Sequence, residues 1–263
     1  MFHDFGGSQA HSVCFGASPP KIVAVPGSIA SWEVWLPTIE ELTRRVGVVA
    51  IDHAGVGQSK FLADQISYEF QLGLLEAVIS DRELERFVLM GDSSNVALVL
   101  DYALKHPSRV GALVLVAGVP WSFDTPQIRS FLGAVKRDFH GTIDAFTHAC
   151  FPEEDSEQLV SWLRDLIAQT GPESVVAILE SYFSIDLRDR LQAVDAPCLV
   201  LGGELDRVAA EGLEGLTTLS DSLSHAELVV LDGVGHVPSM SRPVEVAAEI
   251  LDFLERKGVL TGG

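Results

Sequence analysis

The stretch that decides the fold runs from Phe87 to Ala97 and reads FVLMGDSSNVA. An apolar run typical of a buried strand leads into Gly91, and an apolar pattern with helical spacing begins just after Ser93. A serine at a sharp strand-to-helix turn carries its hydroxyl at the edge of a sheet, close to the free backbone N–H groups of a helix N-terminus. These surroundings suit a nucleophilic serine.

The same residues also have a simpler interpretation, because serine is a favoured N-cap of helices. The stretch follows the nucleophile-elbow motif Gly-x-Ser-x-Gly at its first two defined positions, but Asn95 stands where the motif has its last glycine. On this pentapeptide alone, a nucleophile and a helix cap explain Ser93 equally well. The rest of the chain has to decide between them.

Composition limits the class of protein. The chain has 263 residues, of which 47% are hydrophobic, which suits one globular α/β domain with an insertion or two ordinary domains. The 37 Asp and Glu residues against 18 Lys and Arg give a formal net charge of −19. Such a surface repels the phosphates of nucleic acids and of anionic membranes, so we expect no nucleic-acid and no membrane partner.

Neither targeting signals nor metal-site spacings are visible. No apolar run is long enough to cross a bilayer, and Met1–Gly7 lacks the basic and apolar segments of a secretory signal. The three cysteines, Cys14, Cys150 and Cys198, lie far apart and form no disulfide framework. We therefore expect a cytoplasmic protein with no metal and no cofactor, and a homodimer is left open.

Short runs rich in Val and Leu alternate with amphipathic stretches along the chain. Runs that are apolar at every position are typical of strands covered on both faces, as in a parallel sheet. The alternation predicts an α/β fold, with a mostly parallel central sheet and helices on both faces. The expected strands are residues 21–25, 46–51, 87–90, 112–116, 198–201 and 227–231, and the clearest helices are 32–45, 68–79 and 243–256.

One region breaks this alternation. Residues 121–190 contain no convincing strand pattern, and helical patterns dominate instead, at 126–138, 142–149, 156–169 and 173–183. A helical insertion between two strands predicts a lid over the C-terminal edge of the sheet, where ligands bind in open α/β folds. The predicted division is a core of residues 1–120 and 191–263 with a lid, or cap, of residues 121–190.

Two later segments supply the partners that a nucleophilic serine needs. Asp206 follows the expected strand 198–201, and His236 follows the strand 227–231. A serine hydroxyl is a poor nucleophile unless a histidine accepts its proton and a carboxylate orients that histidine. Each residue alone is ordinarily a turn or cap residue, but Ser93, Asp206 and His236 fall in the right order at one sheet edge. Glu204 competes for the acid role, and Asp206 is favoured.

Four segments carry a wider pattern: VPGS at 25–28 with Trp32 beyond it, DHAGVGQS at 52–59, GELD at 203–206 and GHVP at 235–238. Together they resemble the α/β-hydrolase fold superfamily, from about Lys21 to the C-terminal helix. The chain departs from the family pattern at Pro26, where a histidine is usual, and at Ala54 and Asn95. The resemblance implies an α/β-hydrolase fold with a helical lid inserted after the sixth strand.

The resemblance also implies an oxyanion hole and a substrate pocket. The backbone N–H of Ser94, the residue after the nucleophile, would be one oxyanion donor, and that of Ser28 would be the other. Trp32, Trp121 and Phe123 are candidates to line an apolar pocket under the lid, although aromatic residues at such junctions are more often core.

The leading hypothesis is a serine-dependent hydrolase that cleaves an ester, lactone or related acyl bond of a small, largely apolar substrate through an acyl-enzyme. Two alternatives stay open. The same fold also hosts hydrolases of carbon–carbon bonds and cofactor-free oxygenases, and some members resemble non-catalytic small-molecule receptors. Tests with esters against vinylogous diketones, and with a serine-directed fluorophosphonate, would separate these hypotheses.

Overall fold

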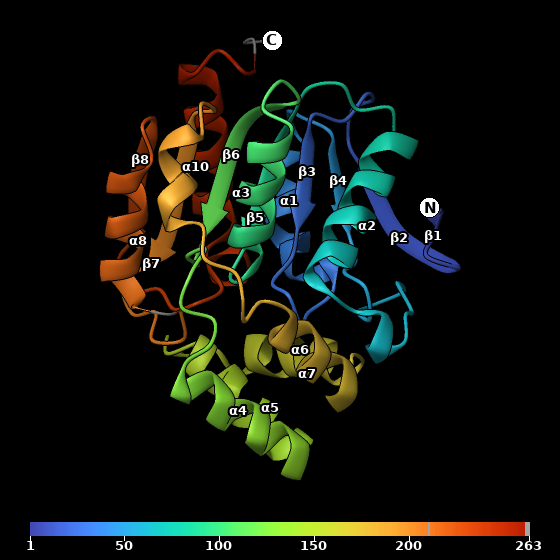
Figure 1. Cartoon of the computed structure of the whole chain (residues 1–263). Coiled ribbons are helices and arrows are strands. Elements are labelled where there is room, and N and C mark those ends of the chain that lie inside the picture. Colours follow the sequence, from blue (N-terminus) through green and yellow to red (C-terminus); the bar gives the residue numbers. More distant parts are fainter. Residues whose placement is uncertain (210, 261–263) are drawn as a thin grey trace.

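A computed structural model describes residues 1–209 and 211–260 of the chain. Eight strands form one sheet in the order β1-β2-β4-β3-β5-β6-β7-β8 (Figure 1). The pairs β1–β2 and β2–β4 are antiparallel, and the other neighbours are parallel, which confirms the predicted mostly parallel sheet. The strands are β1 (Phe2–Phe5), β2 (Ser8–Phe15), β3 (Ile22–Val25), β4 (Val48–Ile51), β5 (Phe87–Asp92), β6 (Val110–Val116), β7 (Cys198–Gly203) and β8 (Ala226–Leu231).

The first two strands were not expected from the sequence. They form an antiparallel hairpin around Gly6 and Gly7, whose φ angles are +57° and +82°. A two-residue turn with both φ angles positive matches the twist of a hairpin, and glycine adopts it without steric cost. Because this hairpin lies at the edge of the sheet, half of its side chains are polar and it lacks the continuous apolar run of the central strands. The Gly-Gly pair was the signal that could have revealed it.

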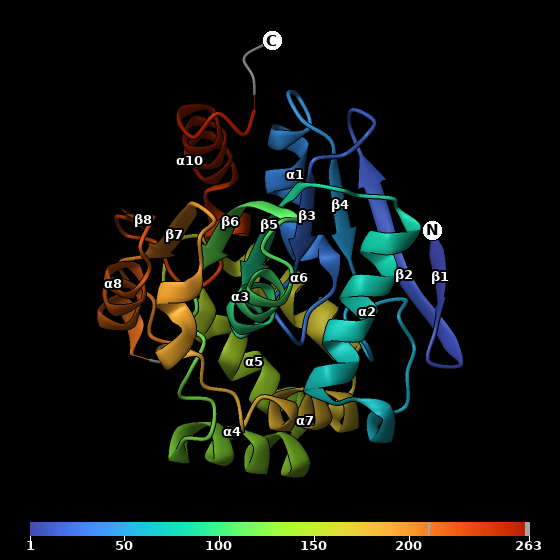
Figure 2. The same ribbon diagram turned by 45° about the horizontal axis from the view of Figure 1, so that its top comes forward.

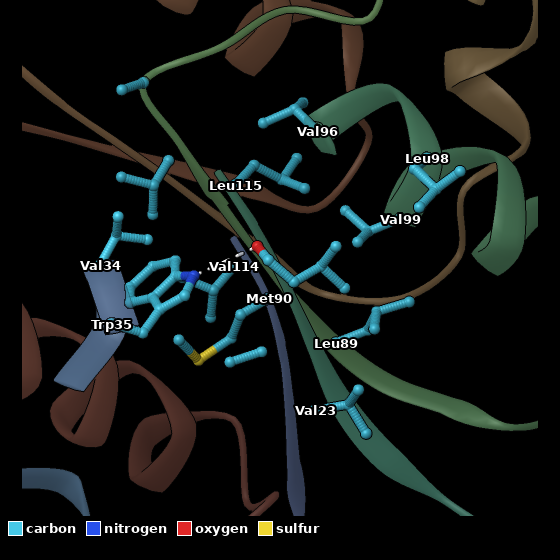
Figure 3. Packing of buried hydrophobic residues seen from close by; sticks show 14 of the residues in the cluster. Val23, Val34, Trp35, Leu89, Met90, Val96, Leu98, Val99, Val114 and Leu115 are labelled. Carbon is cyan, nitrogen blue, oxygen red and sulfur yellow. Dashed lines mark hydrogen bonds between the residues drawn. The ribbon is translucent and has the colours of Figure 1, made fainter. Parts of the chain in front are cut away.

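The central strands explain the strength of the sequence pattern. Every residue of β3, β4, β5, β6 and β7 is buried, since helices cover both faces of the sheet. Figure 3 shows part of this core, where Trp35 packs among Val34, Met90 and Val114. The indole N–H of Trp35 donates to the carbonyl of Val25 at 3.2 Å, so the polar atom of this buried side chain is also satisfied.

The helices form a layer on each side of the sheet. Helices α1 and α10 pack together on one face, and α2, α3 and α8 cover the other (Figures 1 and 2). No helix among the described residues combines the length and the hydrophobicity that a membrane crossing requires. These helices are α1 (Leu36–Leu42), α2 (Tyr68–Asp81), α3 (Asn95–Lys105), α8 (Gly212–Ser222), α9 (Pro238–Ser241) and α10 (Pro243–Arg256), with 3₁₀ helices η1 (Trp32–Trp35), η2 (Ala63–Gln65) and η3 (Arg188–Ala193).

The segment between β6 and β7, residues 121–190, is called the helical insertion below. It holds α4 (Pro126–Arg137), α5 (Phe139–Cys150), α6 (Glu157–Ala168) and α7 (Pro172–Ser181), close to the four expected helical patterns. These helices lie beyond the carboxyl ends of the parallel strands, at the bottom of Figure 1. The insertion therefore stands over the sheet edge at which Ser93 was expected. Its assignment as a separate lid unit stays a prediction.

Candidate active site

Ser93 occupies a strained turn between β5 and α3. Its φ angle is +55°, in the left-handed region that non-glycine residues rarely adopt, and its N–H donates to the carbonyl of Val116 at 2.8 Å. The turn needs two glycines around it. A Cβ on Gly118 would lie 2.0 Å from the Ser93 carbonyl oxygen, and a Cβ on Gly91 would lie 2.7 Å from the Asn95 carbonyl oxygen. The N-cap of α3 is Ser94 rather than Ser93, so helix capping does not explain Ser93.

The structure brings the three predicted side chains into one hydrogen-bonded chain. His236 Nδ1 lies 2.9 Å from Asp206 Oδ2, and His236 Nε2 lies 3.1 Å from Ser93 Oγ. An ionised carboxylate only accepts hydrogen bonds, so Nδ1 carries the proton of the neutral imidazole and Nε2 is left to accept from the serine hydroxyl. The backbone N–H groups of Val208 and Ala209 donate to Asp206 Oδ1 at 2.8 and 3.0 Å, which holds the carboxylate in place.

His236 and Asp206 each shift the pKa of the other toward its ionised form. Burial by itself lowers the pKa of His236, but the neighbouring Asp206 carboxylate outweighs it and raises that pKa above the usual value of 6.5. Burial likewise raises the pKa of Asp206, but the histidine charge and the two backbone donors outweigh it, so the pKa of Asp206 falls below 3.8. Asp206 is therefore ionised at neutral pH and stabilises a cationic His236.

The structure distinguishes the two acids that the sequence left in competition. Glu204 is exposed, and its carboxylate accepts from the backbone N–H of Gly233 at 3.1 Å. Asp206 is buried and faces His236. Glu204 therefore supports the turn that precedes the histidine, whereas Asp206 contacts the imidazole itself.

The helical insertion holds the histidine loop. The carbonyl of Cys150, the last residue of α5, accepts from the backbone N–H of His236 at 2.9 Å, and Glu153 Oε1 accepts from that of Gly235 at 3.0 Å. A Cβ on Gly235 would lie 2.4 Å from the Cys150 carbonyl oxygen, so only glycine permits this contact. Sequence reasoning missed these contacts, because nothing local marks Cys150 or Glu153 as neighbours of His236.

Ser28 and Ser94 lie side by side near the nucleophile. Their hydroxyl oxygens are 2.7 Å apart, and both residues line the same cavity as Ser93. Within residues 1–209 and 211–260, neither the Ser28 nor the Ser94 backbone N–H has a hydrogen-bond acceptor in the protein. These are the two N–H groups that the resemblance implies as oxyanion donors, a role that stays a prediction.

A cavity of about 320 Å³ lies between Ser93 and the helical insertion. Ser93 and His236 line it, and so do Trp121 and Phe123, whose contact with substrate stays a prediction. Trp32 is not among the described residues that line it, and its ring packs on Phe15 with 5.3 Å between centroids. Sequence reasoning missed the apolar residues of the insertion that complete the wall, namely Phe131, Phe146, Leu163, Ile167, Leu179 and Tyr182.

Asp92 is a second carboxyl group beside the nucleophile. It is 4% exposed and lines the cavity, and its Oδ1 has no hydrogen-bond partner among the described residues. Burial raises the pKa of Asp92 to about 7, only partly offset by the positive charge of His236. Asp92 is thus a buried carboxyl group whose charge disfavours the folded state as the pH rises.

We expect Asp92→Asn to stabilise the protein by about 2 kcal/mol at pH 8 and by much less at pH 4. The pKa of Asp92 is raised from 3.8 to about 7 by folding, so the unfolded chain loses this proton first. The penalty is absent below 3.8, grows toward pH 7 and is complete above it. Urea unfolding at the two pH values measures it, with the exposed Glu154→Gln as control. Equal stabilisation at both pH values would contradict this account.

Comparisons with known proteins identify the family and support the fold. The pattern of the alpha/beta hydrolase family matches residues 22–249. The chain is 28% identical over 237 residues to the pimeloyl-(acyl-carrier protein) methyl ester esterase of Nitrosomonas europaea. This alignment covers 85% of this chain and 91% of that protein. It is 26% identical over 257 residues to the monoacylglycerol lipase ABHD6 of Mus musculus, spanning 89% of this chain and 75% of that protein.

A solved structure shares the fold over nearly the whole chain. The enol-lactonase from Burkholderia xenovorans LB400 superposes with a TM-score of 0.88 at 20% identity, covering 97% of this chain and 99% of that one. The chain therefore belongs to the alpha/beta hydrolase family, and the class that the fold and the match define is that of hydrolytic enzymes.

Proposed function

We propose that this protein is a serine-dependent hydrolase that cleaves an ester, lactone or related acyl bond of a small, largely apolar substrate through an acyl-enzyme. The observation that carries the proposal is the hydrogen-bonded chain from Ser93 through His236 to Asp206, which opens on an apolar cavity. The names of the esterase, the lipase and the lactonase above support it, because each acts on an acyl–oxygen bond.

In the first half of the reaction, His236 Nε2 accepts the proton of Ser93 Oγ as the oxygen attacks the acyl carbon. The carbonyl oxygen becomes an oxyanion, which the backbone N–H groups of Ser28 and Ser94 stabilise by hydrogen bonds. The protonated His236 then gives its proton to the departing alcohol oxygen as the acyl–oxygen bond breaks. An acyl-enzyme on Ser93 remains, and Asp206 stabilises the transient imidazolium.

The second half repeats these steps with water. His236 removes a proton from a water molecule, whose oxygen attacks the acyl carbon and forms a second oxyanion. When this collapses, Ser93 Oγ recovers a proton from His236, and the carboxylic acid leaves. The wall contributed by the helical insertion, residues 121–190, would act as the lid that selects small apolar acyl or alcohol groups.

A labelling and turnover experiment tests the proposed function. We expect a fluorophosphonate probe to label the purified protein on Ser93 within minutes, and p-nitrophenyl esters with short acyl chains to be hydrolysed. The control is protein unfolded in urea, which keeps Ser93 but loses the hydrogen bond to His236. Turnover of a vinylogous diketone without esterase activity would instead identify a carbon–carbon hydrolase. Ligand binding with neither labelling nor turnover would identify a receptor.

A further inference from the structure

Asn95 occupies the position at which the elbow motif has glycine, and it is fully buried. Its Nδ2 donates to the carbonyl of Pro26 at 2.6 Å, and its Oδ1 accepts from the hydroxyl of Tyr182. Both hydrogen-bonding ends of the amide are therefore used, one toward the loop that holds Ser28 and one toward the helical insertion. Two of the three departures from the family pattern, Pro26 and Asn95, are partners in one hydrogen bond.

A second hydrogen bond joins the insertion to the same loop. Thr170, between α6 and α7, is buried, and its Oγ1 donates to the carbonyl of Ile29 at 3.0 Å. The carbonyls on either side of Gly27 and Ser28, those of Pro26 and Ile29, are thus each held by a buried side chain. Proline also limits the backbone freedom of the loop at its first residue. The Ser28 N–H lies between these two anchor points.

Tyr182 connects the helical insertion to Asn95, and through Asn95 to the loop that holds Ser28. It caps the C-terminal end of α7, it is fully buried, and it lines the cavity. Its ring packs against Phe123 and Tyr68, with centroids 5.2 and 5.3 Å away. Tyr68 in turn donates to the carbonyl of Ala97 at 3.1 Å, so these three aromatic side chains are also linked to α3, the helix that follows Ser93. Burial raises the pKa of Tyr182 far above 10, so its hydroxyl remains a donor.

We propose that Asn95, Tyr182 and Thr170 are positioning residues for the oxyanion hole. In this proposal, the hydrogen bonds between the helical insertion and the loop hold the Ser28 N–H in place. This rests on the proposed serine hydrolase function. A donor that is misplaced by a fraction of an ångström loses most of its stabilisation of the oxyanion, whereas binding of the uncharged substrate is little affected. Loss of either anchor should therefore lower kcat more than it raises KM.

The test uses Tyr182→Phe, Thr170→Val and the double variant, because Asn95→Asp would bury a charge and put the fold at risk. We expect each single variant to lower kcat about tenfold and the double variant about a hundredfold, with KM changed less than threefold. A trifluoromethyl ketone, whose adduct on Ser93 carries an oxyanion, should lose affinity by the same factors. Titration with the fluorophosphonate measures the concentration of intact active sites. Dividing the maximal rate by this concentration gives a kcat that unfolded protein does not lower.

Two control variants remove hydroxyl groups of buried residues whose hydrogen bonds do not reach the loop. Tyr102→Phe on α3 removes a hydroxyl that donates to the carboxylate of Glu76, and Thr147→Val on α5 removes one that donates to the backbone carbonyl of Asp144 in the same helix. Both should keep kcat within about twofold. Normal kcat and ketone affinity in the double variant would overturn the proposal, as would a loss confined to KM. If the wild-type protein neither hydrolyses esters nor reacts with the probe, the proposed function fails first and this inference falls with it.

Discussion

Ser93→Ala is expected to lower kcat for an activated ester by about 10⁴-fold or more, the largest effect of any single substitution. The substitution removes the oxygen that would form the proposed acyl-enzyme, while the proposed oxyanion donors and the cavity stay in place. What remains is the smaller acceleration that binding and oxyanion stabilisation provide on their own. Steady-state kinetics with a p-nitrophenyl ester, at enzyme concentrations high enough to see the residual rate, measure this loss.

Two checks show that the loss comes from Ser93 chemistry. Circular dichroism and thermal unfolding should match the wild-type protein, since the alanine side chain fits wherever serine did. Ser80→Ala removes an exposed hydroxyl at the end of α2, which donates to Glu76, and should leave kcat unchanged. Turnover within tenfold of wild type in Ser93→Ala, together with probe labelling at another residue, would refute the role of Ser93.

Asp206→Asn is expected to lower kcat by about 10³- to 10⁴-fold with little change in KM. The amide that replaces the carboxylate can donate to His236 Nδ1, which then becomes an acceptor. The remaining proton moves to Nε2, and the imidazole can no longer take the proton of Ser93. The loss of the Asp206 charge also removes the main effect that keeps the pKa of His236 raised, so burial prevails and that pKa falls.

The pH profile separates this explanation from a general loss of structure. Activity requires neutral His236, so wild-type kcat/KM should increase with pH through a pKa above 6.5. In Asp206→Asn the residual activity should show the same increase with pH, but shifted to a lower pH. Glu204→Gln is the matched control, because Glu204 bonds to the Gly233 N–H and not to the imidazole. Comparable losses in both variants, or an unshifted profile in Asp206→Asn, would contradict the assignment of Asp206 as the acid.

Several features of the candidate site were predictable from local pattern. The run that ends in Gly91 and Ser93 predicts a strand, a tight turn and a helix, and β5 and α3 lie there. Asp206 and His236 each follow an apolar run, which places them at the carboxyl edge of a parallel sheet without any knowledge of the tertiary structure. Where the alternation was weak, as in the N-terminal hairpin, the strands were missed.

Other features depend on contacts that no local pattern records. Trp32 and Trp121 are both aromatic residues near a strand end, yet of these two only Trp121 lines the cavity. The ring of Trp32 packs instead against Phe15 on β2. Asn95 looked like a weakened elbow motif from the sequence. Its role as a bridge became visible only once Pro26 and Tyr182 were placed beside it.

The amino-acid sequence by itself therefore determined the α/β architecture and the order in which serine, acid and histidine reach one sheet edge. These follow from hydrophobic periodicity and from glycines at turns, which act over a few neighbouring residues. Only the tertiary structure decided that His236 lies between Ser93 and Asp206, and that residues 121–190 anchor both the histidine loop and the Ser28 loop. Such contacts join residues distant in sequence, and the packing of the whole chain sets their distances.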